Sequence, residues 1–173
     1  MTTDYLYHFS EDPSIKRFVP RPVRIGPSEE ALVWAVDRAN CHQFYFPRDC
    51  PRVVISKSTS TSAEDAETFF GHTTAEVVAA IESRWLRRMC NTTVYRYTLS
   101  SGGFALRDEY AGYWVSEQEC RILEVEPIRD LMTALVDARV ELRIMPSLVS
   151  LRDAVIESTV DFDIIRWRNA VTD

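Results

Sequence analysis

The order of hydrophobic and polar positions along the chain predicts a mixture of strands and helices. Short apolar runs that end at turn residues are typical of strands, and they occur over residues 5–9, 32–36, 53–56, 93–99, 112–116, 120–128 and 140–145. Helical spacing predicts helices over residues 72–89, from 129 or 130 to about 138, and over 148–158. A short helical turn is expected over residues 39–44, where Asp37 precedes it as a cap.

The clearest helical pattern covers residues 72–89. Thr73 and Glu76 form the spacing of a capping box, and apolar residues then recur at helical intervals. The Ser/Thr-rich residues 57–67 before it have low complexity and predict a mobile surface insertion. Three prolines predict a loop over residues 15–27.

Together these elements indicate the α+β fold class. Strands follow one another with isolated helices between them, without strict strand–helix alternation. We expect a single domain over residues 1–173, with a mixed or antiparallel split sheet of about six to seven strands and three helices.

Composition narrows the class of protein. The chain has 173 residues, of which 46% are hydrophobic, and no apolar run has the ~20 residues of a membrane helix. The N-terminal sequence has no signal-peptide pattern, so we expect a cytoplasmic protein without a membrane partner. The four cysteines are widely spaced and form no CxxC pair, so we expect neither disulfides nor a metal site.

The net charge of −6 argues against nucleic acid as a partner, because such binding depends on neutralising phosphates. The charge is uneven: acidic and basic residues balance over residues 1–56, and the deficit lies in 57–173. Almost all positive charge is arginine, which suits planar contacts to carboxylate or phosphate. The alternative is a mere preference of composition, and no oligomeric state is indicated.

His8 lies within the first predicted strand, "YLYHF". A histidine there is either a structural residue with satisfied hydrogen bonds or a group that binds ligand and transfers protons near neutral pH. His72 precedes the predicted helix start, where it either contacts a ligand or merely adjoins the cap. Glu117 and Glu119 follow a strand, where carboxylates either stabilise a developing positive charge or are only solvated.

The segment "FYFPRDCPR" over residues 44–52 is stiffened by two prolines. Arg48 and Arg52 flank Asp49 among aromatic residues. The residues form either an Arg–Asp–Arg ion-pair corner or a rigid cationic rim for a carboxylate or phosphate group.

Two resemblances add to this interpretation. The stretches "LYHFSEDPSIKRFVPR", "VWAVD", "FPRDCPR", "GYWVSE", "ELRIMPSL" and "STVDFDIIRWRNA" resemble a family of small uncharacterised microbial proteins. More distantly, "YH" on a first strand, an apolar second strand with a following tyrosine, and a late strand with carboxylates are similar to the ADP-ribosyltransferase-like fold.

The second resemblance implies an NAD-dependent enzyme, so the partner that we expect is a small-molecule or nucleotide ligand. It assigns His8 to a ribose of NAD, Tyr45 or Phe44 to nicotinamide stacking, and Glu117 or Glu119 to the oxocarbenium-like transition state. Two positions depart from the pattern: Phe9 replaces a small residue, and Gly112 stands where the acid is expected.

Three functions follow as hypotheses. The first is an ADP-ribosyltransferase-like enzyme that binds NAD or a related nucleotide near His8. The second is a non-catalytic binding module on the same fold. The third is a small-metabolite enzyme that uses His8 or His72 as acid or base. Arg48, Arg52 and His72 join Tyr45 and Phe44 as candidate cofactor-binding residues.

Overall fold

The computed structural model describes residues 4–25 and 28–171, and it confirms a mixed α+β protein. The chain forms two compact units, each made of two chain segments. Unit 1 consists of Met1–Cys41 and Thr93–Ile128, and unit 2 of His42–Thr92 and Arg129–Asp173.

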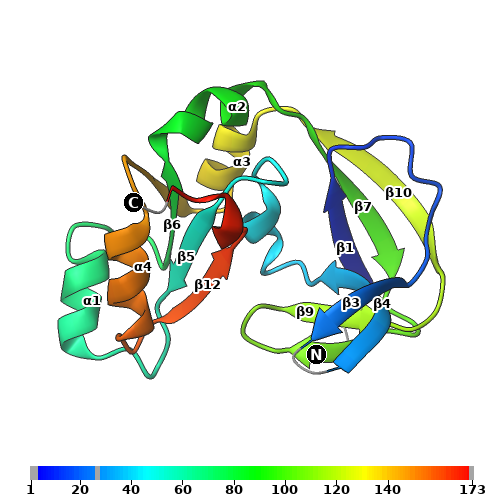
Figure 1. Cartoon of the computed structure of the whole chain (residues 1–173), viewed down its shortest axis with the longest axis horizontal. Helices are drawn as coiled ribbons and strands as arrows, with labels where there is room; N and C mark the ends of the chain where they lie inside the picture. The colour runs from blue at the N-terminus through cyan, green and yellow to red at the C-terminus, as the bar shows by residue number, and fades with distance from the viewer. Residues whose placement is uncertain (1–3, 26–27, 172–173) are drawn as a thin grey trace. The chain divides into compact units, whose positions relative to one another are not determined.

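Unit 1 is built on an antiparallel sheet (Figure 1). Its strands are β1 (Tyr5–Ser10), β2 (Arg17–Phe18), β3 (Arg21–Ile25), β4 (Ser28–Val36), β7 (Val94–Ser100), β8 (Ala105–Asp108), β9 (Tyr113–Ser116) and β10 (Cys120–Ile128). The strand order is β2-β10-β7-β1-β4-β9-β8, and β3 pairs with β4. The predicted strands over 5–9, 32–36, 93–99, 112–116 and 120–128 are confirmed.

The two faces of β1 are different in character. Leu6 and His8 are in register with Leu99 and Tyr97 of β7, so these side chains share one face of the sheet. That face carries the apolar core of unit 1, in which Leu6, Tyr97 and Leu99 have no exposed surface. Tyr7 points to the opposite face.

The pairing between β1 and β4 is short. Tyr7 pairs with Val36 of β4, and no other described residue of β1 is in register with that strand. Beyond this pair, backbone N–H and C=O groups of β1 and β4 can therefore form hydrogen bonds with side chains.

Unit 2 is a second, four-stranded sheet with helices on its two sides. Its elements are η1 (Cys41–Phe44), β5 (Arg52–Ser56), α1 (Ala63–Phe70), β6 (Val77–Glu82), η2 (Ser83–Trp85), α2 (Leu86–Asn91), α3 (Leu131–Asp137), β11 (Val140–Met145), α4 (Val149–Ile156), β12 (Asp161–Ile165) and η3 (Trp167–Asn169). η1 begins at the last residue of unit 1. The strand order is β11-β6-β5-β12, with β11 and β6 parallel and the other pairs antiparallel.

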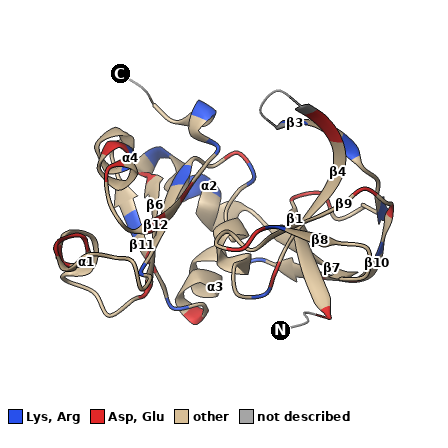
Figure 2. Cartoon of the chain, turned by 90° about the horizontal axis from the view of Figure 1, so that it is seen from below, with Lys and Arg blue, Asp and Glu red and all other residues tan. Residues whose placement is uncertain are grey.

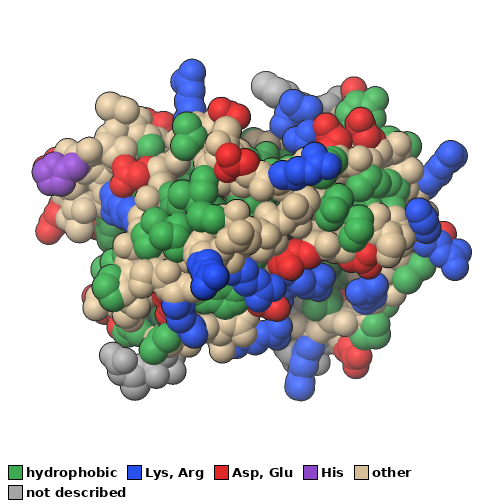
Figure 3. All heavy atoms as spheres, turned by 90° about the horizontal axis from the view of Figure 1, so that it is seen from above, with side chains coloured by type: hydrophobic (Ala, Val, Ile, Leu, Met, Phe, Trp, Pro, Cys, Tyr) green, Lys and Arg blue, Asp and Glu red, His purple; other side chains and the backbone are tan. Residues whose placement is uncertain are grey.

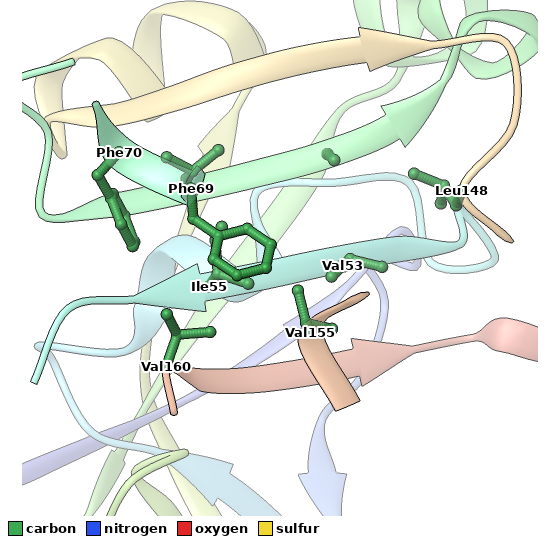
Figure 4. Packing of buried hydrophobic residues seen from close by; sticks show 9 residues of the cluster. Val53, Ile55, Phe69, Phe70, Leu148, Val155 and Val160 are labelled. Carbon is green, nitrogen blue, oxygen red and sulfur yellow. The ribbon is translucent and has the colours of Figure 1, made fainter. Parts of the chain in front are cut away.

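Helices α1 and α4 cover one side of this sheet, and α2 and α3 lie on the other side (Figure 2). On the first side, Phe69 and Phe70 of α1 and Val155 of α4 pack against Val53 and Ile55 of β5 (Figure 4). All five are less than 5% exposed. Burying such side chains contributes about 1.5–3 kcal/mol each, so this cluster is a main source of the stability of unit 2.

The prediction of a helix over residues 72–89 is wrong for the first half of this segment. Residues 77–82 form strand β6, which is buried between β5 and β11, and only the part from 83 is helical. The run "VVAAI" is apolar on every side, which fits a strand covered on both faces as well as a helix. Thr73 does not cap a helix: its hydroxyl accepts a hydrogen bond from the Ala75 N–H at 3.0 Å.

Two predicted loops also contain regular structure. The mobile insertion predicted at 57–67 includes the start of α1, where Ser62 is the N-cap and accepts from the Asp65 N–H. The proline-containing segment holds β2 and β3, while Gly26 and Pro27 lie outside the described residues. The sequence-based count is therefore too low: the described residues form twelve strands in two sheets, and four α-helices.

Candidate functional site

The residues predicted for function are divided between the two units. His8, Glu117 and Glu119, the candidate catalytic residues, belong to unit 1. The candidate cofactor-binding residues belong to unit 2, namely Phe44, Tyr45, Arg48, Arg52 and His72.

His8 is held beside the short pairing between β1 and β4. Its Nδ1 lies 2.8 Å from the carbonyl oxygen of Trp34. Because a carbonyl only accepts, Nδ1 carries the proton of this hydrogen bond. The imidazole also lies against the ring of Phe18, with 4.4 Å between the ring centroids. These contacts join β1, β4 and β2, as the structural alternative for this histidine would require.

Glu117 and Glu119 lie in the exposed turn between β9 and β10. Glu119 forms an ion pair with Arg17 at 3.5 Å, and both side chains are at least half exposed. Exposed pairs of this kind contribute little to stability. Gly112, at the start of β9, has a φ of +66°, and a β-carbon there would come within 2.7 Å of the Asp37 carboxylate. Backbone geometry therefore explains the glycine at the position where the resemblance places an acid.

The opposite face of β1 carries a cluster that the sequence did not single out. Tyr7 is only 4% exposed, and two guanidinium groups approach its ring. Arg38 lies 5.8 Å and Arg96 5.4 Å from the ring centroid, both within the range of cation–π attraction. Arg38 Nε also donates to the Tyr7 hydroxyl at 3.3 Å. A buried aromatic ring thus positions two positive charges.

Glu126 fixes one of these arginines. Arg96 of β7 and Glu126 of β10 are direct partners in register. The carboxylate accepts from Arg96 Nη2 at 2.6 Å and from Nε at 3.1 Å. The Arg96 side chain is 27% exposed and Glu126 is 42% exposed, so the pair lies at the edge of the solvent. A guanidinium held in this way loses little conformational entropy when it binds an anion.

Two further aromatic residues share this face. Val36 pairs with Tyr7 and with Tyr113 of β9, so Tyr7, Tyr113 and the alternate residue Trp34 point the same way. Trp34 and Tyr113 are half-buried and meet edge to face with 5.9 Å between centroids. The Trp34 Nε1–H is buried without a hydrogen-bond partner in the described part of the chain. We call these residues the tyrosine–arginine face: Tyr7, Trp34, Arg38, Arg96 and Tyr113.

One signal in the sequence points to this face. In "VYRYT" the arginine alternates with tyrosines that face the core, which places Arg96 on the other side of the strand. Nothing in the sequence shows that this side meets Tyr7, because the register of β1 and β7 joins residues about 90 positions apart.

In unit 2, Arg52 closes the loop that precedes β5. Its side chain is buried, and the residue is 3% exposed. Nε donates to the Gln43 carbonyl at 2.8 Å and Nη1 to the Cys50 carbonyl at 3.0 Å. The guanidinium also lies 5.0 Å from the ring centroid of Phe46. Burial raises the pKa of the adjacent Cys50 thiol to about 12, so that it stays protonated at neutral pH.

The other candidate residues of unit 2 occupy its surface layer. Arg48 is exposed, and its carbonyl accepts a hydrogen bond from Arg166 Nε. Phe44 ends η1 and lies 5.9 Å from the Arg52 guanidinium, and Tyr45 follows it half-buried. His72 is exposed in the turn between α1 and β6.

The comparison with protein families matches residues 7–170, nearly the whole chain, to a family of unknown function. The chain belongs to the DUF6886 family. This confirms the resemblance to an uncharacterised family. No curated protein and no solved structure matches this DUF6886 chain. The resemblance to ADP-ribosyltransferases therefore rests on the order of sequence features alone. Within residues 4–25 and 28–171, no helix is long and apolar enough to cross a membrane.

Proposed function

We propose that the chain binds a nucleotide on the tyrosine–arginine face of unit 1, and that NAD is the nucleotide to test first. The observation that carries this proposal is the pair of guanidinium groups, Arg38 and Arg96, set on one buried tyrosine ring. Glu126 pairs with Arg96, and two guanidinium groups with this one carboxylate leave a net positive charge, which favours a phosphate or diphosphate group.

The neighbouring aromatic residues support a nucleotide over a simple anion. Half-buried Trp34 and Tyr113 offer aromatic surface beside the arginines. Stacking of a base on an aromatic side chain contributes about 1–3 kcal/mol. A ligand with both a phosphate and a flat ring would use both parts of the face.

For the reaction, we propose NAD-dependent ADP-ribosyl transfer as the first candidate. The sequence resemblance supports it. His8 lies on the opposite face of the sheet from the tyrosine–arginine face, so turnover is tested separately from binding. Binding without turnover, and acid–base chemistry by His8 or His72, are the alternatives. Release of nicotinamide from NAD separates the first from the other two.

Isothermal titration with NAD tests the binding proposal. We expect Arg38→Gln and Arg96→Gln each to weaken NAD binding by about tenfold or more, since each removes a charged hydrogen-bond donor to phosphate. Arg107→Gln is the matched control: Arg107 belongs to unit 1 and pairs with a carboxylate, as Arg96 does, but it is not part of the tyrosine–arginine face. The absence of heat at millimolar NAD in folded protein, or equal losses in all three variants, would overturn the proposal.

A further inference from the structure

A second group of arginines lies in unit 2, where three chain segments meet. Arg48 is in the loop before β5, Arg84 in η2, and Arg166 and Arg168 at η3. Side chains tie the segments together: Asn169 Nδ2 donates to the Asp49 carbonyl at 2.7 Å, and Arg166 Nε donates to the Arg48 carbonyl at 3.1 Å. We call Arg48, Arg84, Arg166 and Arg168 the arginine cluster. Figure 2 shows basic positions on α2 and on the C-terminal segment, which are parts of the same unit.

One acidic group beside the cluster is buried and already engaged. Glu82 has no exposed surface, and its carboxylate accepts from Arg84 Nε and from the Val171 N–H, both at 2.7 Å. Asp49 is the other acidic residue in these segments. The buried carboxylate neutralises Arg84, so Arg166 and Arg168 keep a local excess of positive charge.

Arg166 has an uncommon backbone conformation. Its φ is +57° and its ψ is +31°, the left-handed region that favours glycine. A non-glycine residue there costs roughly 1–2 kcal/mol. This conformation places the side chain against the loop of Arg48, while Nη1 and Nη2 have no partner in the described part of the chain. Strained residues of this kind concentrate at functional sites.

We propose that the arginine cluster binds the diphosphate group of a small ligand. Two of its arginines are fixed by backbone carbonyls, Arg84 by that of Asn169 and Arg166 by that of Arg48, which lowers the entropy that binding would cost. A diphosphate has enough charge and enough acceptor oxygens for more than one guanidinium. A long nucleic acid fits less well, because the chain carries a net charge of −6. Figure 3 shows acidic and apolar side chains among the basic ones on one face.

Titration of the full chain with inorganic pyrophosphate tests this proposal. We expect Arg166→Gln and Arg168→Gln to weaken binding by about tenfold, because each removes a charged donor. Arg129→Gln, an exposed arginine of the same unit, is the control with the same change in charge. Equal affinity in all three variants would overturn the proposal.

Two further measurements separate the alternatives. Arg166→Gly relieves the strained backbone, so we expect a melting temperature close to that of the original protein together with weakened pyrophosphate binding. A purely structural arginine would instead lower the melting temperature and leave binding intact.

Arg38→Gln in unit 1 should not change this binding, which distinguishes the site from the proposed nucleotide site. Tighter binding of a DNA or RNA oligonucleotide than of pyrophosphate, lost in Arg166→Gln, would refute a small-ligand site.

Discussion

Replacing Arg52 by methionine tests whether this buried guanidinium holds the loop before β5 in place. Arg52 donates to the Gln43 and Cys50 carbonyls, and both acceptors lose their partner in Arg52→Met. Methionine leaves an apolar side chain beside Phe46, so the change removes the charge, its hydrogen bonds and its cation–π contacts with Phe44 and Phe46. The variant therefore isolates the polar contribution of the side chain.

The size of the effect follows from these two bonds. Hydrogen bonds to charged groups contribute about 1.5–3 kcal/mol each. Removing a buried charge also ends its desolvation, which offsets part of that loss. We expect the free energy of unfolding to fall by about 2–5 kcal/mol, a large part of the roughly 5–15 kcal/mol of a typical domain.

Urea unfolding followed by tryptophan fluorescence and circular dichroism measures this change. With a slope of about 2 kcal/mol per molar urea, the midpoint should fall by about 1–2.5 M. Arg129→Met, at an exposed arginine of the same unit, should change stability by less than about 0.5 kcal/mol.

The result also decides between the two interpretations of Arg52 that the sequence left open. An Arg52→Met protein as stable as the original, but unable to bind NAD or pyrophosphate, would refute the structural interpretation and support a cofactor-binding arginine.

Three other outcomes can be checked directly. Gly112→Ala should lower the free energy of unfolding by about 1–3 kcal/mol, because its left-handed backbone and the nearby Asp37 leave no room for a β-carbon; thermal melting measures this. Iodoacetamide at pH 8 should modify exposed Cys90 first and spare buried Cys50, whose pKa is raised to about 12, as mass spectrometry would show. Hydrogen bonds from Thr73 and Arg143 lower the pKa of Glu141, so its stabilisation is present above its ordinary pKa and is lost as pH falls through the lowered value. Thr73→Val should therefore destabilise the protein more at pH 6 than at pH 3, and equal losses would contradict this.

Residues 72–89 show where sequence patterns stop being decisive. A capping-box spacing and an apolar stripe predict a helix, yet "VVAAI" forms a strand between β5 and β11. A helix and a strand can both bury an apolar run. The extended form is favoured here because neighbouring strands form hydrogen bonds with its backbone.

The elements with local signals were predicted well. Asp130 accepts from the Thr133 N–H at the start of α3, and the strand over 120–128 has the bounds that its pattern predicts. Such features depend on residues a few positions apart, so the sequence contains the whole signal.

For the candidate sites, too, some features were visible in the sequence and others were set only by tertiary structure. The sequence alone identified the α+β class, the position of His8 on a first strand and the unusual arginines of the loop over residues 44–52. Tertiary structure decided that Arg96 meets Tyr7, that Arg52 is buried, and that Arg166 lies against the loop of Arg48. These contacts join residues far apart in the chain or depend on burial. They are set by strand register and packing, and no local pattern of residue types encodes those directly.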